Sequence, residues 1–168
     1  LARRRLAPQL PRGVVMFVQA NAEATPFADR SFAAVHAKAV IHHIDLGLAA
    51  AELNRLLAPG GRAAIAEPLA HHPLFWLARR LSPRLRTQDE RPLSLAELAS
   101  FAGRFAQARV EVMFLLAPLA YVFRLLPRCE PLFGVTHRAL CAVDSALFRL
   151  LPFLRRFAWY GVVLAHKS

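Results

Sequence analysis

Cysteine is scarce in this chain, which has two, Cys129 and Cys141, among 168 residues. Both lie in an apolar stretch that favours helix, and they do not form a CxxC pair. This arrangement gives no support to a disulfide framework or to a cysteine zinc site. We therefore expect two free thiols in a reducing compartment and predict a cytoplasmic protein.

Long uncharged apolar runs are also lacking. The longest, residues 112–123, contains Pro118 and falls short of the roughly 20 residues that a membrane-spanning helix needs. The sequence therefore predicts that this chain does not span a membrane.

Negative charge is sparse, with 11 Asp and Glu against 22 Lys and Arg, so that the net charge is +11. Such an excess can serve binding to nucleic acid or to an anionic membrane. Nearly all of the basic residues are Arg and are scattered among Ala and Leu, a bias that genome composition also produces. We therefore expect a solvated basic surface and no nucleic-acid partner.

Hydrophobic residues make up 56% of the chain, enough for one domain with a buried core. Short apolar runs predict strands at residues 14–18, 33–37 and 62–66, and Asp45 is placed to cap a helix that continues to Leu57. An alternation of strands and helices that are joined by tight glycine turns is typical of a parallel α/β sheet. We expect this cofactor-side core to occupy residues 1–67.

In the second half of the chain we expect a loop and helix that cover the sheet, followed by the last strands of the sheet. Residues 68–107 contain a Pro-, His- and Arg-rich loop or broken helix up to Pro92, then a capping box, Ser94 to Glu97, that opens a helix. Residues 108–168 contain strands at 109–115 and 159–165, separated by two or three short helices at about 118–154.

Three motifs in order carry a family resemblance. Residues 18–35 contain Asn-Ala-Glu, then Thr-Pro-Phe, then Ser-Phe-Ala; Ile41-His42-His43 follows, and then the segment 56–62, Leu-Leu-Ala-Pro-Gly-Gly-Arg. Together they resemble the ubiquinone/menaquinone-type branch of class I S-adenosylmethionine-dependent methyltransferases. The resemblance implies a Rossmann-like α/β sheet that is incomplete at the N-terminus, where the glycine-rich cofactor loop would lie, with a helical insertion before the last strand.

The resemblance also implies a cofactor site for S-adenosylmethionine at the carboxyl ends of the strands. Asn21 and Ala22 would lie beside the adenine, where Asn can accept a hydrogen bond in place of the usual Asp. Ala37 and Lys38 would border the methionine part of the cofactor. His42 is assigned to the same cofactor-binding set.

Several residues are candidates for catalysis and substrate binding. His43 could act as a base, because imidazole titrates near neutral pH, or could simply pack at a turn. Glu67 would point into the cleft, remain a solvated loop carboxylate or pair with a nearby Arg. His71 and His72 would belong to a substrate lid or to a helix over the sheet edge. The histidines lack acidic or cysteine partners at ligand spacing, so no metal is predicted.

The sequence thus predicts methyl transfer to a small acceptor, apolar or lipid-like, in the complete protein, while this chain alone would be inactive. A non-catalytic interaction module derived from a methyltransferase is the alternative. The Arg-studded apolar segment 121–156 would contact the inner membrane surface or form an ordinary helical cover.

Overall fold

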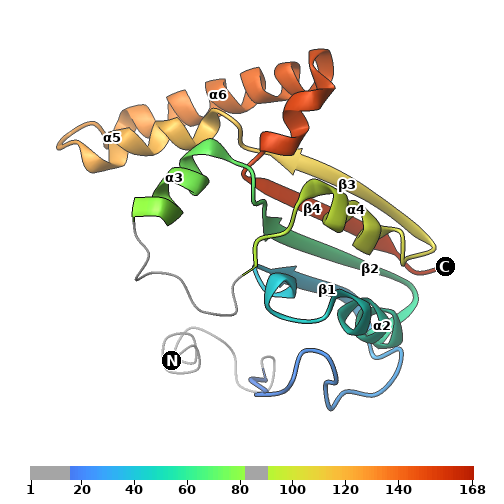
Figure 1. The fold of residues 1–168 in the computed structure, drawn as a ribbon. Helices are drawn as coiled ribbons and strands as arrows, with labels where there is room; N and C mark the ends of the chain where they lie inside the picture. Colours follow the sequence, from blue (N-terminus) through green and yellow to red (C-terminus); the bar gives the residue numbers. More distant parts are fainter. Residues whose placement is uncertain (1–15, 82–90) are drawn as a thin grey trace.

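The computed structural model describes residues 16–81 and 91–168, which form a four-stranded sheet with helices (Figure 1). The strands lie in the order β1-β2-β4-β3. Their bounds are Phe32–Lys38 for β1, Leu57–Pro68 for β2, Gln107–Met113 for β3 and Tyr160–His166 for β4. The predicted Rossmann-like α/β class is confirmed.

The parallel arrangement predicted for the strands of residues 1–67 is confirmed for β1 and β2, and the last strand, for which no direction was predicted, runs the other way. β1 and β2 are parallel, whereas β4 runs antiparallel to both β2 and β3. The reason is the helical insertion, which leaves the sheet after Met113 and returns at Tyr160, and these two residues pair with each other. A connection that begins and ends at the same end of a sheet reverses the direction of the chain.

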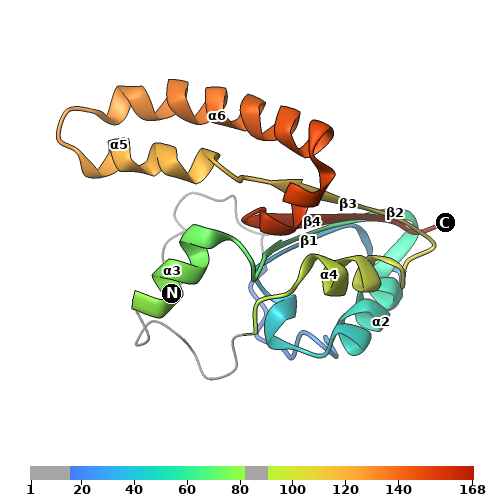
Figure 2. The same cartoon turned by 45° about the horizontal axis from the view of Figure 1, so that its top comes forward.

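Two helices cover one face of the sheet (Figure 2). Helix α2, Leu46–Leu56, is capped by Asp45, whose carboxylate accepts from the N–H groups of Gly47 and Leu48. Helix α4, Leu95–Ala102, opens with the complete capping box of Ser94 and Glu97. Both predicted caps are confirmed. The core between these helices and the sheet includes Leu53, Leu98, Phe101, Ile65 and Val163.

One predicted strand is wrong. Residues 16–18 have no regular secondary structure and Met16 is 76% exposed, while residues 14 and 15 lie outside the described part of the chain. An apolar run forms a strand only when another strand pairs with it. Among the described residues, none pairs with this segment, and the outer edge of β1 is likewise unpaired.

The predicted loop and insertion contain more helix than expected. Helix α3, Pro73–Leu81, lies inside the segment predicted as loop or broken helix. The insertion comprises a 3-10 turn, Ala117–Tyr121, a short α5, Val122–Leu125, a long α6, Glu130–Leu150, and a second 3-10 turn, Pro152–Phe157. Pro131 and Pro152 stand in first turns, where a missing N–H costs nothing. Within the described ranges, no helix has the length and apolar character needed to cross a bilayer.

Candidate functional site

The carboxyl ends of β1 and β2 lie side by side because the two strands are parallel neighbours. Ala39, directly after β1, takes a positive φ of 53° and donates its N–H to the carbonyl of Ala66 at 2.8 Å. This bend leads into the 3-10 turn Ile41–His43. The turn therefore lies against the end of β2, where Glu67 is located.

Glu67 is fully buried and both of its carboxylate oxygens are occupied. Oε1 accepts from the backbone N–H groups of Val40 and Ile41, at 2.8 and 2.9 Å. Oε2 lies 2.6 Å from Nδ1 of His42, which is itself 7% exposed. Hydrogen bonds to a carboxylate are about twice as strong as neutral ones. Glu67 thus fixes the turn after β1 and the ring of His42.

The bond to Glu67 also sets the chemistry of the His42 ring. A neutral imidazole that donates from Nδ1 keeps its lone pair on Nε2. His43 is exposed, and its ring centroid lies 4.0 Å from that of His42. The structure therefore brings His42, His43 and Glu67 together, and Glu67 contacts His42 and the backbone rather than open space.

The segment with Asn21 and Ala22 is exposed and is held by helix α2. Oδ1 of Asn21 accepts from the N–H of Glu23 at 3.0 Å, which closes a local turn. The Glu23 carboxylate accepts from the N–H of Asp45 at 2.8 Å. The amide oxygen of Asn21 therefore has one of its two acceptor positions in use.

A second anchor of this segment was missed by the sequence analysis. Glu52 of α2 is buried and accepts from the N–H and the hydroxyl of Thr25, at 2.7 and 2.6 Å. Arg55 donates to both oxygens of Glu52, and to Asp29 at 2.7 Å. The Arg55 hydrogen bond, followed by those from Thr25, lowers the pKa of Glu52 to about 2 against the opposing effect of burial, and Glu52 raises the pKa of Arg55.

Beside this anchor lies a mainly apolar cavity of about 380 Å³. Ala22 and Thr25 line it together with Phe27, Phe32 and Glu52. Ala22 is thus a predicted cofactor residue that borders an open pocket. Ala37 instead packs its side chain against the hydrophobic core, and Lys38 is exposed at the end of β1.

The two predicted substrate histidines lie in different environments. His71 is exposed, whereas His72 is 1% exposed. Nε2 of His72 lies 3.0 Å from the carbonyl of Leu115, and its ring lies 5.0 Å from that of Trp159. Burial lowers the pKa of His72, which favours the neutral ring that donates to this carbonyl. His72 therefore connects the turn after β2 to the end of β3.

Two further polar residues near this connection were missed. Asp144 of α6 is 2% exposed and accepts from the N–H groups of Leu115, Leu116 and Ala117, at 2.8, 2.8 and 3.1 Å. Tyr160 begins β4 opposite Pro68, and burial raises its pKa, followed by the nearby charge of Glu67. The insertion and the last strand thus contribute to the same end of the sheet as His42.

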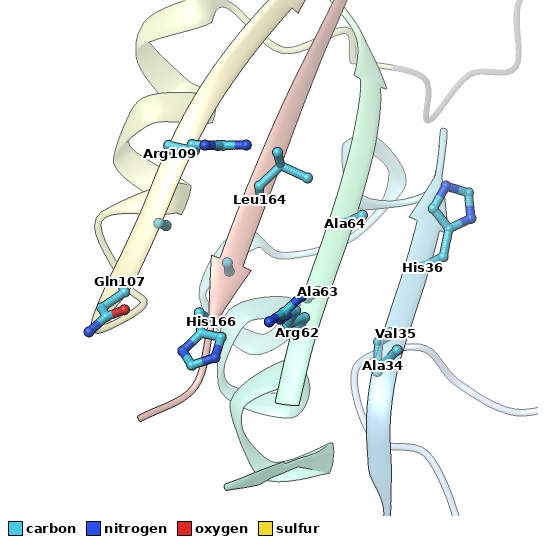
Figure 3. A pocket seen from close by; sticks show the side chains of 12 residues that line it. Ala34, Val35, His36, Arg62, Ala63, Ala64, Gln107, Arg109, Leu164 and His166 are labelled. Carbon is cyan, nitrogen blue, oxygen red and sulfur yellow. The ribbon is translucent and has the colours of Figure 1, made fainter. Parts of the chain in front are cut away.

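The face of the sheet that α2 and α4 do not cover forms a broad hollow of about 830 Å³ (Figure 3). Side chains from all four strands line it, among them His36, Arg62, Leu164 and Arg109. This hollow is separate from the strand ends that carry the predicted site residues. In the described segments, no group of three or more His, Cys, Asp or Glu residues is placed to hold a metal ion.

Sequence comparison relates part of this chain to known proteins. Residues 1–65 match the family model described as a methyltransferase domain. The O-methyltransferase cnsE of Penicillium expansum is 35% identical over 74 residues, which are 44% of this chain and 27% of that protein. The uncharacterized protein YafE of Escherichia coli is 41% identical over 63 residues, 35% of this chain and 30% of that protein. The chain thus matches less than a third of the length of either relative.

Solved structures resemble most of the chain. A possible histamine N-methyltransferase from Thermotoga maritima superimposes with a TM-score of 0.61 at 16% identity, over 92% of this chain and 65% of that one. A geranyl diphosphate C-methyltransferase from Streptomyces coelicolor gives 0.60 at 17% identity, over 99% and 59%. The fold is therefore that of class I S-adenosylmethionine-dependent methyltransferases. The ubiquinone/menaquinone-type branch stays a prediction.

Proposed function

We propose that the domain to which this chain contributes transfers a methyl group from S-adenosylmethionine to a small apolar or lipid-like acceptor. The observation that carries this proposal is the ordered turn after β1, which Glu67 ties to the end of β2 through Val40, Ile41 and His42. Open α/β sheets bind their ligands at the carboxyl ends of such strands. The methyltransferase-domain match over residues 1–65 includes both the Asn21 segment and this turn.

The residues proposed for the cofactor fit it in part. Asn21 retains one free acceptor position for the adenine amine, and Ala22 lines the adjoining cavity. Ala37 can contribute only backbone, because its side chain packs against the core, while Lys38 and the fixed ring of His42 border the same strand end. When bound, the cofactor supplies the electrophilic methyl group, and the protein aligns the acceptor and excludes water.

In the proposed mechanism, Glu67 is a positioning residue and His43 is the base. Glu67 holds His42, and the His43 ring lies against that of His42 at the exposed side of the turn. His43 would take a proton from an acceptor hydroxyl or an acidic carbon. An acceptor that needs no deprotonation would use the turn for orientation alone.

On the acceptor side we propose that His71, which is exposed, contacts the substrate, while His72 positions the turn through Leu115. Tyr160 and Trp159 lie at the same end of the sheet. The geranyl diphosphate enzyme that shares the fold acts on an isoprenoid, which supports an apolar acceptor for this domain.

The test uses protein expressed from the whole reading frame that encodes this chain. Calorimetry should detect binding of S-adenosylmethionine and of S-adenosylhomocysteine, and tritiated methyl should pass to an isoprenoid quinol or phenol. His43→Gln should lower kcat by about 10²- to 10⁴-fold and leave cofactor affinity unchanged. Arg109→Gln changes an exposed residue of the hollow face that does not line the smaller pocket, and this control should change neither quantity.

Absence of cofactor binding in that protein would contradict the proposal and favour the non-catalytic interaction module. We further propose that the 168-residue chain alone does not turn over, because its matches span less than a third of the relatives' length. Methyl transfer by the isolated chain would contradict this second statement.

A further inference from the structure

Helix α6 presents an apolar stripe to solvent. The stripe follows helical spacing along the whole helix, and each of its members is exposed. Residues three and four apart lie on one face of a helix. The members of this stripe are Leu132, Val135, Ala139, Ala142, Val143, Ala146 and Leu150.

The charged groups of α6 lie beside and opposite this stripe. Arg138 and Arg149 are exposed and lie along one flank of the stripe at helical spacing. Asp144 lies on the inner side, buried against residues 115–117. A helix that only covers a core carries apolar residues inside and charges outside. Helix α6 has an apolar inner side, where Phe148 packs against the core, but it also has an apolar outer face. The outer face of α6 is therefore built to contact something apolar.

The apolar surface continues at the tip of the hairpin formed by α5 and α6. Leu125 is 82% exposed and Leu126 is 47% exposed. Arg124 lies over the ring of Phe133 at 4.2 Å and over Tyr121 at 5.7 Å, so its charge stands beside apolar surface.

Helix α3 adds to this end of the molecule. Both views show α3 at the same end as α5, away from the C-terminus (Figures 1 and 2). Trp76, Leu77 and Leu81 of α3 are exposed, and Arg80 lies over the Trp76 ring at 5.3 Å. Exposed aromatic rings next to arginine are typical of surfaces that meet lipid headgroups.

The charge of the insertion is almost entirely positive. Between residues 117 and 157 the acidic residues are Glu130 and Asp144, of which Asp144 is buried. Against them stand six exposed arginines: Arg124, Arg128, Arg138, Arg149, Arg155 and Arg156. Anionic headgroups would neutralise these arginines. A second copy would instead bring another chain of net charge +11 to the same surface.

We propose that α6 lies on the surface of an anionic phospholipid bilayer, with its apolar stripe in the acyl boundary and its arginines at the headgroups. The α5–α6 tip and α3 extend the contact. This binding requires no methyl donor, so it stands or fails separately from the proposed function. It would place the strand ends near a source of lipid-like acceptors.

The experiment is co-sedimentation of the 168-residue chain with vesicles of phosphatidylcholine alone or mixed with phosphatidylglycerol. We expect binding to the mixed vesicles that weakens with salt. Each arginine near an anionic surface is worth about 1 kcal/mol, or roughly fivefold, so Arg138→Gln with Arg149→Gln should weaken binding roughly 25-fold. Val135→Gln with Val143→Gln should weaken it about tenfold or more.

Two controls separate lipid contact from damage to the fold. Val135→Leu with Val143→Leu keeps the stripe apolar and should bind at least as tightly as the unchanged chain. Leu48→Gln changes a leucine on α2 that is 52% exposed and should leave binding unchanged. Circular dichroism of every variant checks that the helices are retained.

Three results would overturn the proposal. The first is no difference between the two kinds of vesicle, and the second is full binding by the glutamine pair at positions 135 and 143. The third is a dimer in analytical ultracentrifugation that this pair converts to monomer while vesicle binding is absent, which would assign the stripe to a second copy.

Discussion

Replacing Asp144 tests how the helical insertion is attached to the sheet. Its carboxylate accepts three backbone hydrogen bonds, from Leu115 and Ala117 at Oδ2 and from Leu116 at Oδ1. Asp144→Ala removes all three and leaves three donors in a partly buried site. The nearby Ala117 is completely buried, so water reaches this site poorly.

The expected loss follows from these contacts. A hydrogen bond to a charged group contributes about 1.5 to 3 kcal/mol, and removing a buried charge returns part of its desolvation cost. We therefore expect Asp144→Ala to lower the free energy of unfolding by about 3 to 5 kcal/mol. Asp144→Asn keeps one oxygen but turns an amide N–H₂ toward a donor, so about half of that loss is expected.

Equilibrium urea unfolding, followed by circular dichroism, measures this difference. With a slope of about 1 to 3 kcal/mol per molar urea, the midpoint of Asp144→Ala should fall by roughly 2 M. The neighbouring Ser145→Ala is the control, since Ser145 is exposed and should change the free energy of unfolding by less than about 0.5 kcal/mol. A loss below about 1 kcal/mol for Asp144→Ala would refute the reasoning.

Four other substitutions are tested by the same unfolding measurement. The folded-state pKa of Glu52 is about 2 instead of 4.5, so its contribution is complete above pH 4.5 and is lost as pH falls toward 2; Glu52→Gln should flatten this acid dependence. Gly161→Ala should cost about 1 to 3 kcal/mol, because its Cβ would lie 2.3 Å from a methyl group of Leu98. Gly134→Ala on α6 should instead gain about 0.5 to 1 kcal/mol, because its Cβ would make only an ordinary contact, 3.9 Å from a nitrogen of Arg138. Glu67→Gln should destabilise the turn after β1 by about 1 to 3 kcal/mol, and an unchanged free energy of unfolding would contradict its role there.

Local signals in the sequence predicted local structure well. Asp45 and the Ser94–Glu97 pair were identified as caps because a cap and its N–H partners lie within three residues of each other. The strands at 33–37, 62–66 and 159–165 were found because each is a short apolar run, although β2 begins earlier, at Leu57. The run at residues 14–18 shows the limit of this signal, since an apolar run does not reveal whether a partner strand exists.

The polar contacts that hold the candidate site were not predictable in the same way. Thr25 and Glu52 are 27 residues apart, and Asp144 lies 27 to 29 residues from its three donors. No spacing rule connects positions so far apart. The pairing of Glu67 with His42 has the same character. His42 was selected through the family resemblance and Glu67 through its place at a strand end, but the contact between them follows from the parallel register of β1 and β2.

Two hydrogen bonds of the Leu115 backbone decide which residue types can occupy position 115. The N–H of Leu115 donates to Asp144 of α6, and its carbonyl accepts from His72, which follows β2 in the sequence. One residue thus connects the insertion to the turn after β2, near the candidate site. Neither contact uses the leucine side chain. Position 115 can therefore change residue type while both ties persist, with proline as the exception because it has no N–H to donate.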